Sequence, residues 1–379
     1  MFYVDLTPEH LALQEKVRAF IAEHVIPVAK HYDRTGEFPL PILQEAAQAG
    51  LLNYAVPKEY GGPGLDALSI AIISEELGYG CVGIGMAMNG NTLSSYPVLI
   101  AGNDEQKKRW YQYLHEGKLV AFALTEPGAG SDAAAVETTA VRDGDEYVIN
   151  GSKCFCTTGG YASAMVVFAS TDRSQGHRGL SAFIVEADRP GVSVGKEEHK
   201  MGIRASQTVE VLFRNVRIPK ENLLGREGEG FRIAMQTLDS GRISVAAMAV
   251  GLGRRALEAT IDFVNRYQRG GRPLAKSQYY QFRIADLGTA LENARNLVYK
   301  ASYLKDAGRP FTKEAAMAKT YATDTAMQIA AAAVEIMGPY GYMKDSPVEK
   351  LMRDVKVMQI YEGTNQIQRI VISRQLMGK

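Results

Sequence analysis

In the stretch TVEVLFRNVRIPKENLLGREGEGFRIAMQ, residues 208–236, the pattern of the chain changes from strand to helix. Residues 208–219 are rich in β-branched and aromatic side chains, which favour strands. From Gly228 onward the apolar residues recur at helical spacing, and they are Phe231, Ala234, Leu238, Ile243, Ala246 and Val250. A β-rich region therefore ends near residues 219–224, and a long helix begins soon after it.

The regions on either side extend this pattern. Short β-rich runs separated by turn residues also lie between residues 146 and 195, namely EYVING, MVVFAS, LSAFIVEA and GVSVG. Near the start of the chain, Thr7 is placed to cap a helix whose first residue is Pro8. The sequence predicts an α+β protein, mostly α, with a helical domain at 1–119, a β domain at 120–227 and a second helical domain at 228–379.

The composition excludes several classes of protein. Lys and Arg number 43 and Asp and Glu 42, so no overall charge favours nucleic acid or a membrane surface. The longest apolar runs, such as residues 329–334, are far too short to span a membrane. Three cysteines cannot build a disulfide framework and suit a reducing compartment. The N-terminal residues are acidic too early for a targeting peptide, so we expect a soluble intracellular protein.

Several patterns resemble functional motifs but have simpler interpretations. Gly251-x-Gly253-x-x-Ala256 fits a loose dinucleotide fingerprint, yet the residues before it continue a helix instead of a strand, which favours close helix packing. Cys154 and Cys156 have no second pair and no histidine at metal spacing, so we expect no metal site. The six histidines are scattered along the chain, and none is assigned to catalysis.

Three motifs remain that carry chemistry. FALTEPGAGSD at 122–132 forms a Gly-rich turn that can present N–H groups and hydroxyls to a flat polar ligand. NGSKCFCTTGG at 150–160 offers an aromatic ring and hydroxyls beside it. MQIYEGTNQI at 358–367 holds a single acid, Glu362, between an aromatic residue and a glycine. Glu362 is either a solvated loop residue or a general base whose pKa is raised by desolvation.

The order of these motifs, together with KMGIRASQT at 200–208 and PVEKLMRD at 347–354, resembles the acyl-CoA dehydrogenase family over essentially the whole chain. The similarity is to the short- and medium-chain branch, which is like butyryl-CoA dehydrogenase. The resemblance implies an N-terminal helical domain, a central β-barrel-like domain and a C-terminal four-helix bundle. It also implies assembly as a homotetramer, in the bacterial cytoplasm or, for a mature eukaryotic chain, in the mitochondrial matrix.

The resemblance implies FAD as cofactor, an acyl-CoA thioester as substrate and an electron-transfer flavoprotein as redox partner. Glu362 is the implied base for the α-proton, and flavin N5 accepts the β-hydride. The thioester carbonyl is polarised by the backbone N–H of Glu362 and by a ribityl hydroxyl. Gly363 lets the backbone approach the ligand closely. A related branch carries its base just before the arginine of a helix, where this chain has Gly241 before Arg242.

Further site residues are implied only by the resemblance. Those expected to contact the cofactor are Phe122, Leu124, Thr125, Gly130, Ser131, Phe155, Thr157, Gln278, Thr364 and Gln366. Those expected to contact the substrate are Ser131, Asp239, Arg242, Tyr361, Gly363 and Arg374.

Four positions depart from the family pattern, and all four are expected to face the ADP half of FAD. They are Tyr267 for an arginine, Gly270 for a phenylalanine, Glu335 for a glutamine and Pro339 for a glycine. We therefore expect weaker FAD binding than is usual for the family. Besides dehydrogenation, two alternatives stay open: an enoyl-CoA reductase working in the reverse direction, and an acyl-CoA-binding paralogue with weakened FAD binding. The sequence leaves the acyl chain length and branching open.

Overall fold

The first third of the chain is helical. The computed structural model describes residues 5–378. Thr7 caps the first helix as predicted, because its hydroxyl accepts a hydrogen bond of 3.3 Å from the N–H of His10. The helical segments are α1 (Pro8–Phe20), a π-helical turn (Ile21–Val25), α2 (Ala29–Thr35), α3 (Leu40–Gln48), a 3₁₀ turn (Lys58–Tyr60), α4 (Ala67–Gly80), α5 (Val82–Ala101) and α6 (Asp104–His115).

The middle of the chain forms one eight-stranded sheet. Its strands are β1 (Leu119–Ala123), β2 (Thr139–Asp143), β3 (Glu146–Thr157), β4 (Ala162–Ser170), β5 (Leu180–Glu186), β6 (Val192–Glu197), β7 (Thr208–Pro219) and β8 (Leu223–Leu224). Short 3₁₀ turns (Arg173–Gly179 and Lys220–Asn222) lie between them. The strand order is β6-β7-β3-β2-β4-β5-β8, and β1 pairs in parallel with β4. The predicted strand at 208–219 is confirmed as β7.

The sheet separates two apolar cores. On one side Tyr147, Phe183 and Phe213 pack together within the strands. On the other side Trp110 of α6 and Phe168 of β4 belong to a core that also takes in the start of the following long helix. The sheet is therefore buried on both faces, which explains the near-continuous apolar runs of β4 and β5.

The C-terminal part is a bundle of long helices. Its elements are α7 (Gly230–Arg266), a hairpin of β9 (Gln268–Arg269) and β10 (Arg272–Pro273), a 3₁₀ turn (Leu274–Lys276), α8 (Gln278–Asp306), α9 (Thr312–Met337), α10 (Pro339–Tyr342), α11 (Pro347–Met358) and α12 (Asn365–Leu376). The GLGRRA segment lies inside α7. A Cβ on Gly251 would lie 1.8 Å from the carbonyl oxygen of Glu75 on α4, so the interpretation as close helix packing is confirmed.

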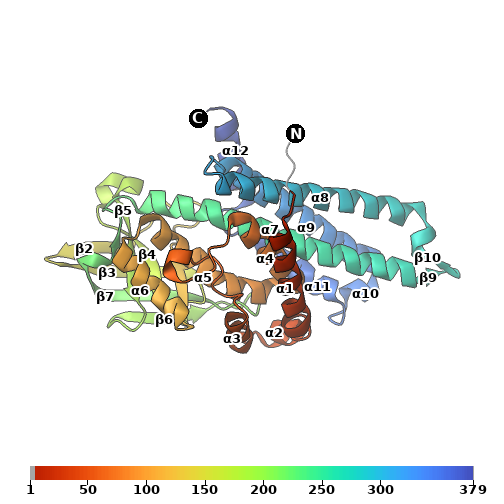
Figure 1. Cartoon of the computed structure of the whole chain (residues 1–379), viewed down its shortest axis with the longest axis horizontal. Coiled ribbons are helices and arrows are strands. Elements are labelled where there is room, and N and C mark those ends of the chain that lie inside the picture. The colour runs from red at the N-terminus through yellow and green to blue at the C-terminus, as the bar shows by residue number, and fades with distance from the viewer. Residues whose placement is uncertain (1–4, 379) are drawn as a thin grey trace.

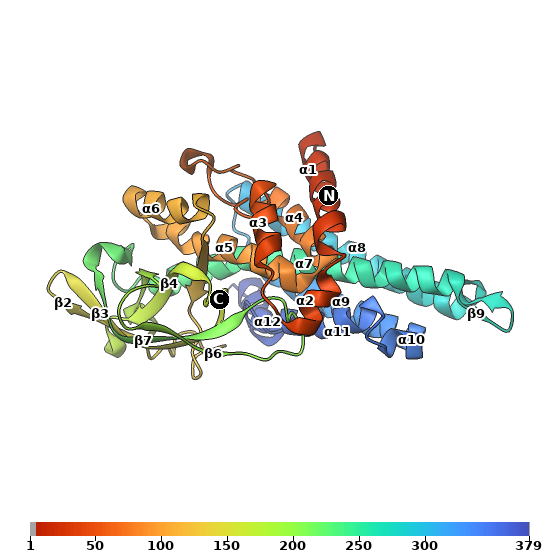
Figure 2. The ribbon, with the colours of Figure 1, turned by 90° about the horizontal axis from the view of Figure 1, so that it is seen from below.

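The β region and the β9–β10 hairpin lie at opposite ends of the long bundle (Figures 1 and 2). Helix α7 joins the two ends, and its 37 residues span about 55 Å. The N-terminal helices α1 to α3 lie across the middle of the bundle (Figure 1). The domain division at 119/120 and 227/228 remains a prediction. None of the helices within residues 5–378 is both long and apolar enough to cross a membrane.

Candidate active site

Glu362 lies in the short loop between α11 and α12. Its backbone is left-handed, with φ of +53°, and Gly363 follows with φ of +86°. A residue with a side chain costs about 1–2 kcal/mol in this conformation, so the surrounding structure must hold it there. The carboxyl group faces α7, where a Cβ on Gly241 would lie 2.8 Å from Oε2 of Glu362. Gly241 therefore leaves the space that the carboxyl group occupies.

The surroundings of Glu362 favour a base that works near neutral pH. The residue is half-buried, but its Oε2 is covered and accepts no hydrogen bond from residues 5–378. Burial raises the pKa of Glu362 to about 7, and the positive charges of Arg242 and Lys319 oppose that rise. A carboxylate that titrates near 7 and has a free oxygen can take up a proton from a carbon acid.

Three side chains hold the carbonyl groups of the Glu362 loop. Nε of Arg242 donates to the carbonyl oxygen of Glu362 at 3.3 Å. Nε2 of Gln368 donates to the carbonyl oxygens of Glu362 at 2.9 Å and of Gly363 at 3.1 Å. Nζ of Lys319 donates to the carbonyl oxygen of Gly363 at 2.9 Å. The main-chain N–H of Glu362, in contrast, has no acceptor within residues 5–378, so it can donate to a ligand.

The predicted substrate residues around this loop have different surroundings. Tyr361 contacts α5, where its hydroxyl lies 3.3 Å from Sδ of Met86. Arg242 is buried and paired with Asp239 at 2.5 Å, and Asp239 also accepts a hydrogen bond of 2.6 Å from Thr312. Because Nε of Arg242 also donates to the carbonyl oxygen of Glu362, the guanidinium faces the Glu362 loop. Three other predicted residues lie on or beside α12: Thr364 caps the helix, whereas Gln366 and Arg374 are exposed.

The motif FALTEPGAGSD forms a tight turn after β1. Glu126 and Ala129 exchange two main-chain hydrogen bonds of 3.1 Å, which close the turn. A Cβ on Gly130 would meet no atom within 4 Å, and Ser131 is exposed, so the tip of the turn is open to a ligand. Phe122 and Leu124 anchor the start of the turn in the apolar core: Phe122 packs on Phe168, and Leu124 is buried.

A buried lysine that the sequence did not predict joins this turn to NGSKCFCTTGG. Lys153 is fully buried, and its Nζ donates to the carbonyl oxygen of Leu124 at 3.0 Å and to Glu126 at 2.7 Å. The N–H of Cys154 donates to the carbonyl oxygen of Thr125 at 2.8 Å. A buried charge without a partner is costly, so Lys153 and Glu126 must stay paired. Their ion pair therefore fixes the relative position of the two motifs. A lone lysine inside an apolar β segment was the available signal.

Phe155 presents its ring beside the turn. Its residue is 59% exposed and its φ is +56°, so the strand bulges where Cys154 and Cys156 point inward. Thr157, two residues later, is half-buried. An exposed ring, hydroxyls and an open Gly-rich turn suit a flat polar ring system, so these residues fit the isoalloxazine of FAD. Within residues 5–378 no group of His, Cys, Asp and Glu is arranged to hold a metal ion.

Helix α5 connects the two halves of the site. A Cβ on Gly241 would lie 3.0 Å from Leu93 of α5, beside Glu362. One turn earlier on α5, a Cβ on Gly90 would lie 3.4 Å from Thr158 at the end of NGSKCFCTTGG. The Glu362 loop and the two Gly-rich motifs therefore lie along one face of α5.

The four departures from the family pattern lie at or near the hairpin end of the bundle, remote from the β region (Figure 1). Tyr267 stacks on Phe263 at 4.9 Å and meets Tyr340, the neighbour of Pro339, at 5.4 Å. Gly270 forms the hairpin turn, and exposed Glu335 lies 3.7 Å from Arg283. Gln278, also predicted to bind the cofactor, is exposed here at the start of α8, so a single chain does not bring it to Glu362.

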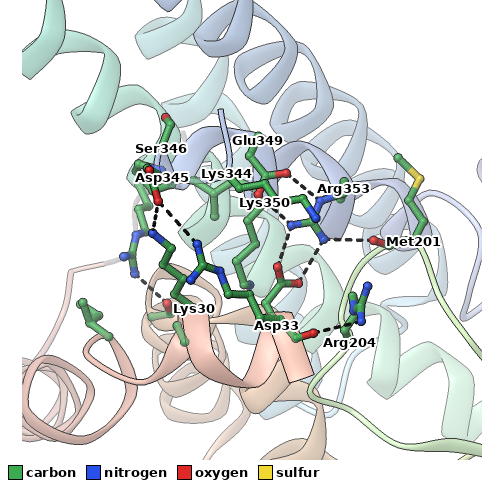
Figure 3. Close-up of a pocket in the computed structure, with 17 residues that line it drawn as sticks. Lys30, Asp33, Met201, Arg204, Lys344, Asp345, Ser346, Glu349, Lys350 and Arg353 are labelled. Atoms are coloured by element: carbon green, nitrogen blue, oxygen red, sulfur yellow. Dashed lines mark hydrogen bonds and ion pairs between the residues drawn. The ribbon is translucent and has the colours of Figure 1, made fainter. Parts of the chain in front are cut away.

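A cluster of ion pairs joins the three regions of the chain beside a cavity of about 670 Å³ (Figure 3). Arg353 of α11 donates to both carboxylate oxygens of Asp33 on α2, at 3.0 and 2.7 Å, and to the carbonyl oxygen of Met201 at 3.1 Å. The next residue, Asp354, accepts a hydrogen bond of 2.6 Å from the N–H of Ile203. The cavity does not include Glu362, but the cluster fixes α11, which leads directly into the Glu362 loop.

Three family models match the chain in sequence order. They describe the N-terminal domain of acyl-CoA dehydrogenase at residues 7–118, the middle domain at 121–216 and the C-terminal domain at 228–377. The chain belongs to the acyl-CoA dehydrogenase family. It is therefore an oxidoreductase of the CH–CH bond of acyl-CoA, in a family of FAD flavoproteins.

Individual relatives are similar over their full length. Butyryl-CoA dehydrogenase from Megasphaera elsdenii superposes with a TM-score of 0.96 at 41% identity, covering 99% of this chain and 100% of that one. A chain from a structure of the electron transferring flavoprotein of Acidaminococcus fermentans superposes with a TM-score of 0.97 at 44% identity, covering 100% of this chain and 100% of that one. The acryloyl-CoA reductase (NADH) of Anaerotignum propionicum is 44% identical over 378 residues, 99% of this chain and 96% of the relative.

Proposed function

We propose that the protein catalyses the FAD-dependent α,β-dehydrogenation of a short- or medium-chain acyl-CoA, with Glu362 as the base. The observation that carries this proposal is the position of the Glu362 carboxyl group against Gly241, where no side chain competes for the space. The carboxyl group has a free, covered oxygen, a pKa raised to about 7 and a reserved space opposite a glycine. A surface glutamate would have none of these properties.

The residues of the chain account for the proton transfer. The carboxylate of Glu362 takes the proton from Cα as that C–H bond breaks, while the free N–H of the same residue donates to the thioester carbonyl oxygen. Because Arg242, Gln368 and Lys319 already hold the loop carbonyls, the N–H and the carboxylate keep one orientation. Bound FAD supplies the acceptor for the hydride that leaves Cβ.

We assign the ring-binding role to Thr125, Ser131, Phe155 and Thr157, with Phe122, Leu124 and Gly130 shaping the turn. Thr364 and Gln366 follow the base loop and extend this surface. Gln278 and the hairpin lie at the remote end of the bundle, so we propose that a second subunit brings them to the cofactor, within a homotetramer. Arg374, exposed on α12, and the Asp239–Arg242 pair are proposed to lie along the CoA chain.

An electron-transfer flavoprotein is the proposed redox partner, supported by the likeness to a chain from the Acidaminococcus fermentans structure. The three free cysteines, all buried, agree with a reducing compartment such as the bacterial cytoplasm or the mitochondrial matrix.

A second direction of catalysis is supported by the similarity to acryloyl-CoA reductase. In that direction Glu362 begins protonated and delivers its proton to Cα of an enoyl-CoA. A pKa near 7 serves both directions, because both protonation states are populated at neutral pH. Rates measured with butyryl-CoA and an electron acceptor, and with crotonyl-CoA and the reduced flavoprotein, distinguish the two directions.

The variant Glu362→Gln tests the proposal. We expect it to keep the fold and bound FAD, while the rate at which butyryl-CoA bleaches the flavin falls by about 10²–10⁴-fold or more. Glu105→Gln serves as a matched control, because Glu105 is an exposed residue on α6. If Glu362→Gln bleaches at near wild-type rate with a good acyl-CoA, Glu362 is not the base.

A further inference from the structure

We propose that Lys319 is a positioning residue for the base, which fixes the Glu362 loop and places a positive charge beneath its carboxylate. This inference rests on the proposed function, because it assigns Glu362 the role of base. Lys319 lies on α9 in the alanine-rich stretch AAMAKTYAT, residues 315–323. Its role could not be predicted from the sequence, because nothing in the stretch shows which group the lysine contacts.

Lys319 is buried without a direct ion pair. It is 0% exposed, and its Nζ donates to the carbonyl oxygen of Gly363 at 2.9 Å and to Oδ1 of Asn365 at 2.8 Å. Both acceptors are neutral, whereas moving an ammonium group out of water costs several kcal/mol. The neighbours Ala318 and Ala322 are buried too, so the ammonium group is enclosed by the protein. A buried cation of this kind needs a nearby negative charge.

The acceptor side of Asn365 is fixed by its other contacts. Nδ2 of Asn365 donates to Thr323 at 2.9 Å and to Asp324 at 2.8 Å. With its amide nitrogen held by α9, Asn365 must present its oxygen to Lys319. One lysine therefore holds both Gly363, directly after the base, and the first residue of α12. The left-handed turn at residues 362–363 is closed between these two contacts.

The charges around the carboxylate come from three elements. Arg242 and Asp239 lie on α7, Lys319 and Asp324 lie on α9, and Arg369 lies on α12. Arg242 is already paired with Asp239, and Arg369 with Asp324 at 2.9 Å. Lys319 is the cation in this group without a carboxylate of its own among residues 5–378. Glu362 is the carboxylate that complements it.

The titrations of the two groups agree with this geometry. Burial lowers the pKa of Lys319 to about 7, while the negative charge of Glu362 opposes that fall. Burial raises the pKa of Glu362 to about 7, and Lys319 is one of the two cations that oppose the rise. Removing the charge at position 319 therefore raises the pKa of Glu362, and a smaller fraction of the base is ionised at neutral pH.

The test measures proton abstraction without electron transfer to a partner. FAD-loaded wild type, Lys319→Met and Lys319→Arg are incubated with butyryl-CoA in D₂O at several pH values, and α-deuterium uptake is followed by mass spectrometry. We expect the apparent pKa of exchange to rise by about one unit in Lys319→Met. In Lys319→Arg it should fall below the wild-type value, because a guanidinium stays charged throughout. Lys305→Met is the matched control, because Lys305 is a half-buried lysine of α8 whose Nζ lies 4.5 Å from the ring centroid of Tyr96 instead of at the Glu362 loop.

Each outcome bears on one proposal. If wild type exchanges the α-proton and Glu362→Gln does not, Glu362 is supported as the base. If wild type shows no exchange, the proposed function is contradicted, and this result does not involve Lys319. If wild type exchanges and folded Lys319→Met keeps the same apparent pKa, the role of Lys319 is wrong. If Lys319→Met does not fold, Lys319→Arg decides: an apparent pKa equal to or above that of wild type contradicts the proposal, and a lower one supports it.

Discussion

Glu362→Gln should make the protein more stable, and the gain should grow as the pH rises. The folded state raises the pKa of Glu362 from 4.5 to about 7, so it binds the proton more tightly than the unfolded chain does. Such a group favours folding below pH 4.5, and this contribution is lost as the pH rises to about 7. Glutamine has no charge to desolvate, so the variant avoids the loss.

The size of the gain follows from the pKa shift. A shift of about 2.5 units corresponds to at most about 3.4 kcal/mol at 1.36 kcal/mol per unit. Partial exposure of Glu362 to solvent reduces this, so about 1–3 kcal/mol is the expected gain at pH 8. With an unfolding entropy of about 2.1 cal/mol/K per residue, this corresponds to a rise in Tm of about 1–4 °C.

Thermal unfolding of the FAD-loaded proteins at pH 5 and pH 8 measures the effect. The difference in Tm between Glu362→Gln and wild type should be about a quarter as large at pH 5 as at pH 8. Glu105→Gln, an exposed control, should show no such pH dependence. An equal difference at both pH values would show that the folded state does not raise the pKa of Glu362.

Three further predictions concern other parts of the chain. Gly202→Ala should lower the free energy of unfolding by about 1–3 kcal/mol, because its Cβ would lie 2.3 Å from the carbonyl oxygen of Arg353. Gly128→Ala is the control, because a Cβ there would meet no atom within 4 Å. Equal Tm values for the two variants in thermal unfolding would contradict the clash. Tyr267→Arg with Glu335→Gln should tighten FAD binding by roughly 2 kcal/mol, measured by flavin fluorescence in apoprotein; nanomolar binding in wild type, unchanged in the double variant, would contradict weak FAD binding. Light scattering should give a mass of several 41.4 kDa chains, and a single-chain mass in the FAD-loaded sample would exclude a shared site.

Local patterns predicted much of the fold. The strand at Thr208–Pro219 and the helix that starts at Pro8 after its Thr7 cap were predicted correctly, because alternation, caps and turn residues act within a few positions. The position of Glu362 beside Gly241 was expected only through the family resemblance, since the two are far apart in sequence. The direction of Arg242 was not foreseen, because a short-range pattern does not reveal that its guanidinium turns toward the Glu362 loop.

The buried lysines were missed for the same physical reason. Lys153 and Lys319 are single charges in apolar segments, a pattern that fits a structural or a functional role equally well. Their partners lie in other segments: Lys153 meets Leu124 and Lys319 meets Gly363. Such contacts depend on how strands and helices pack, which periodicity along one segment does not encode.

The space between α7 and the Glu362 loop has a consequence for how the proposed catalytic base can change during evolution. It holds the carboxyl group of one residue, because a Cβ on Gly241 would already lie 2.8 Å from Glu362. Moving the base from the loop to the helix takes two substitutions. If the helix acquires its acid first, two carboxylates compete for one space and cannot both ionise. If the loop loses its acid first, the proposed base is absent. Every single-step path therefore passes through a strained or an inactive intermediate, which tends to keep each lineage with the base position it already has.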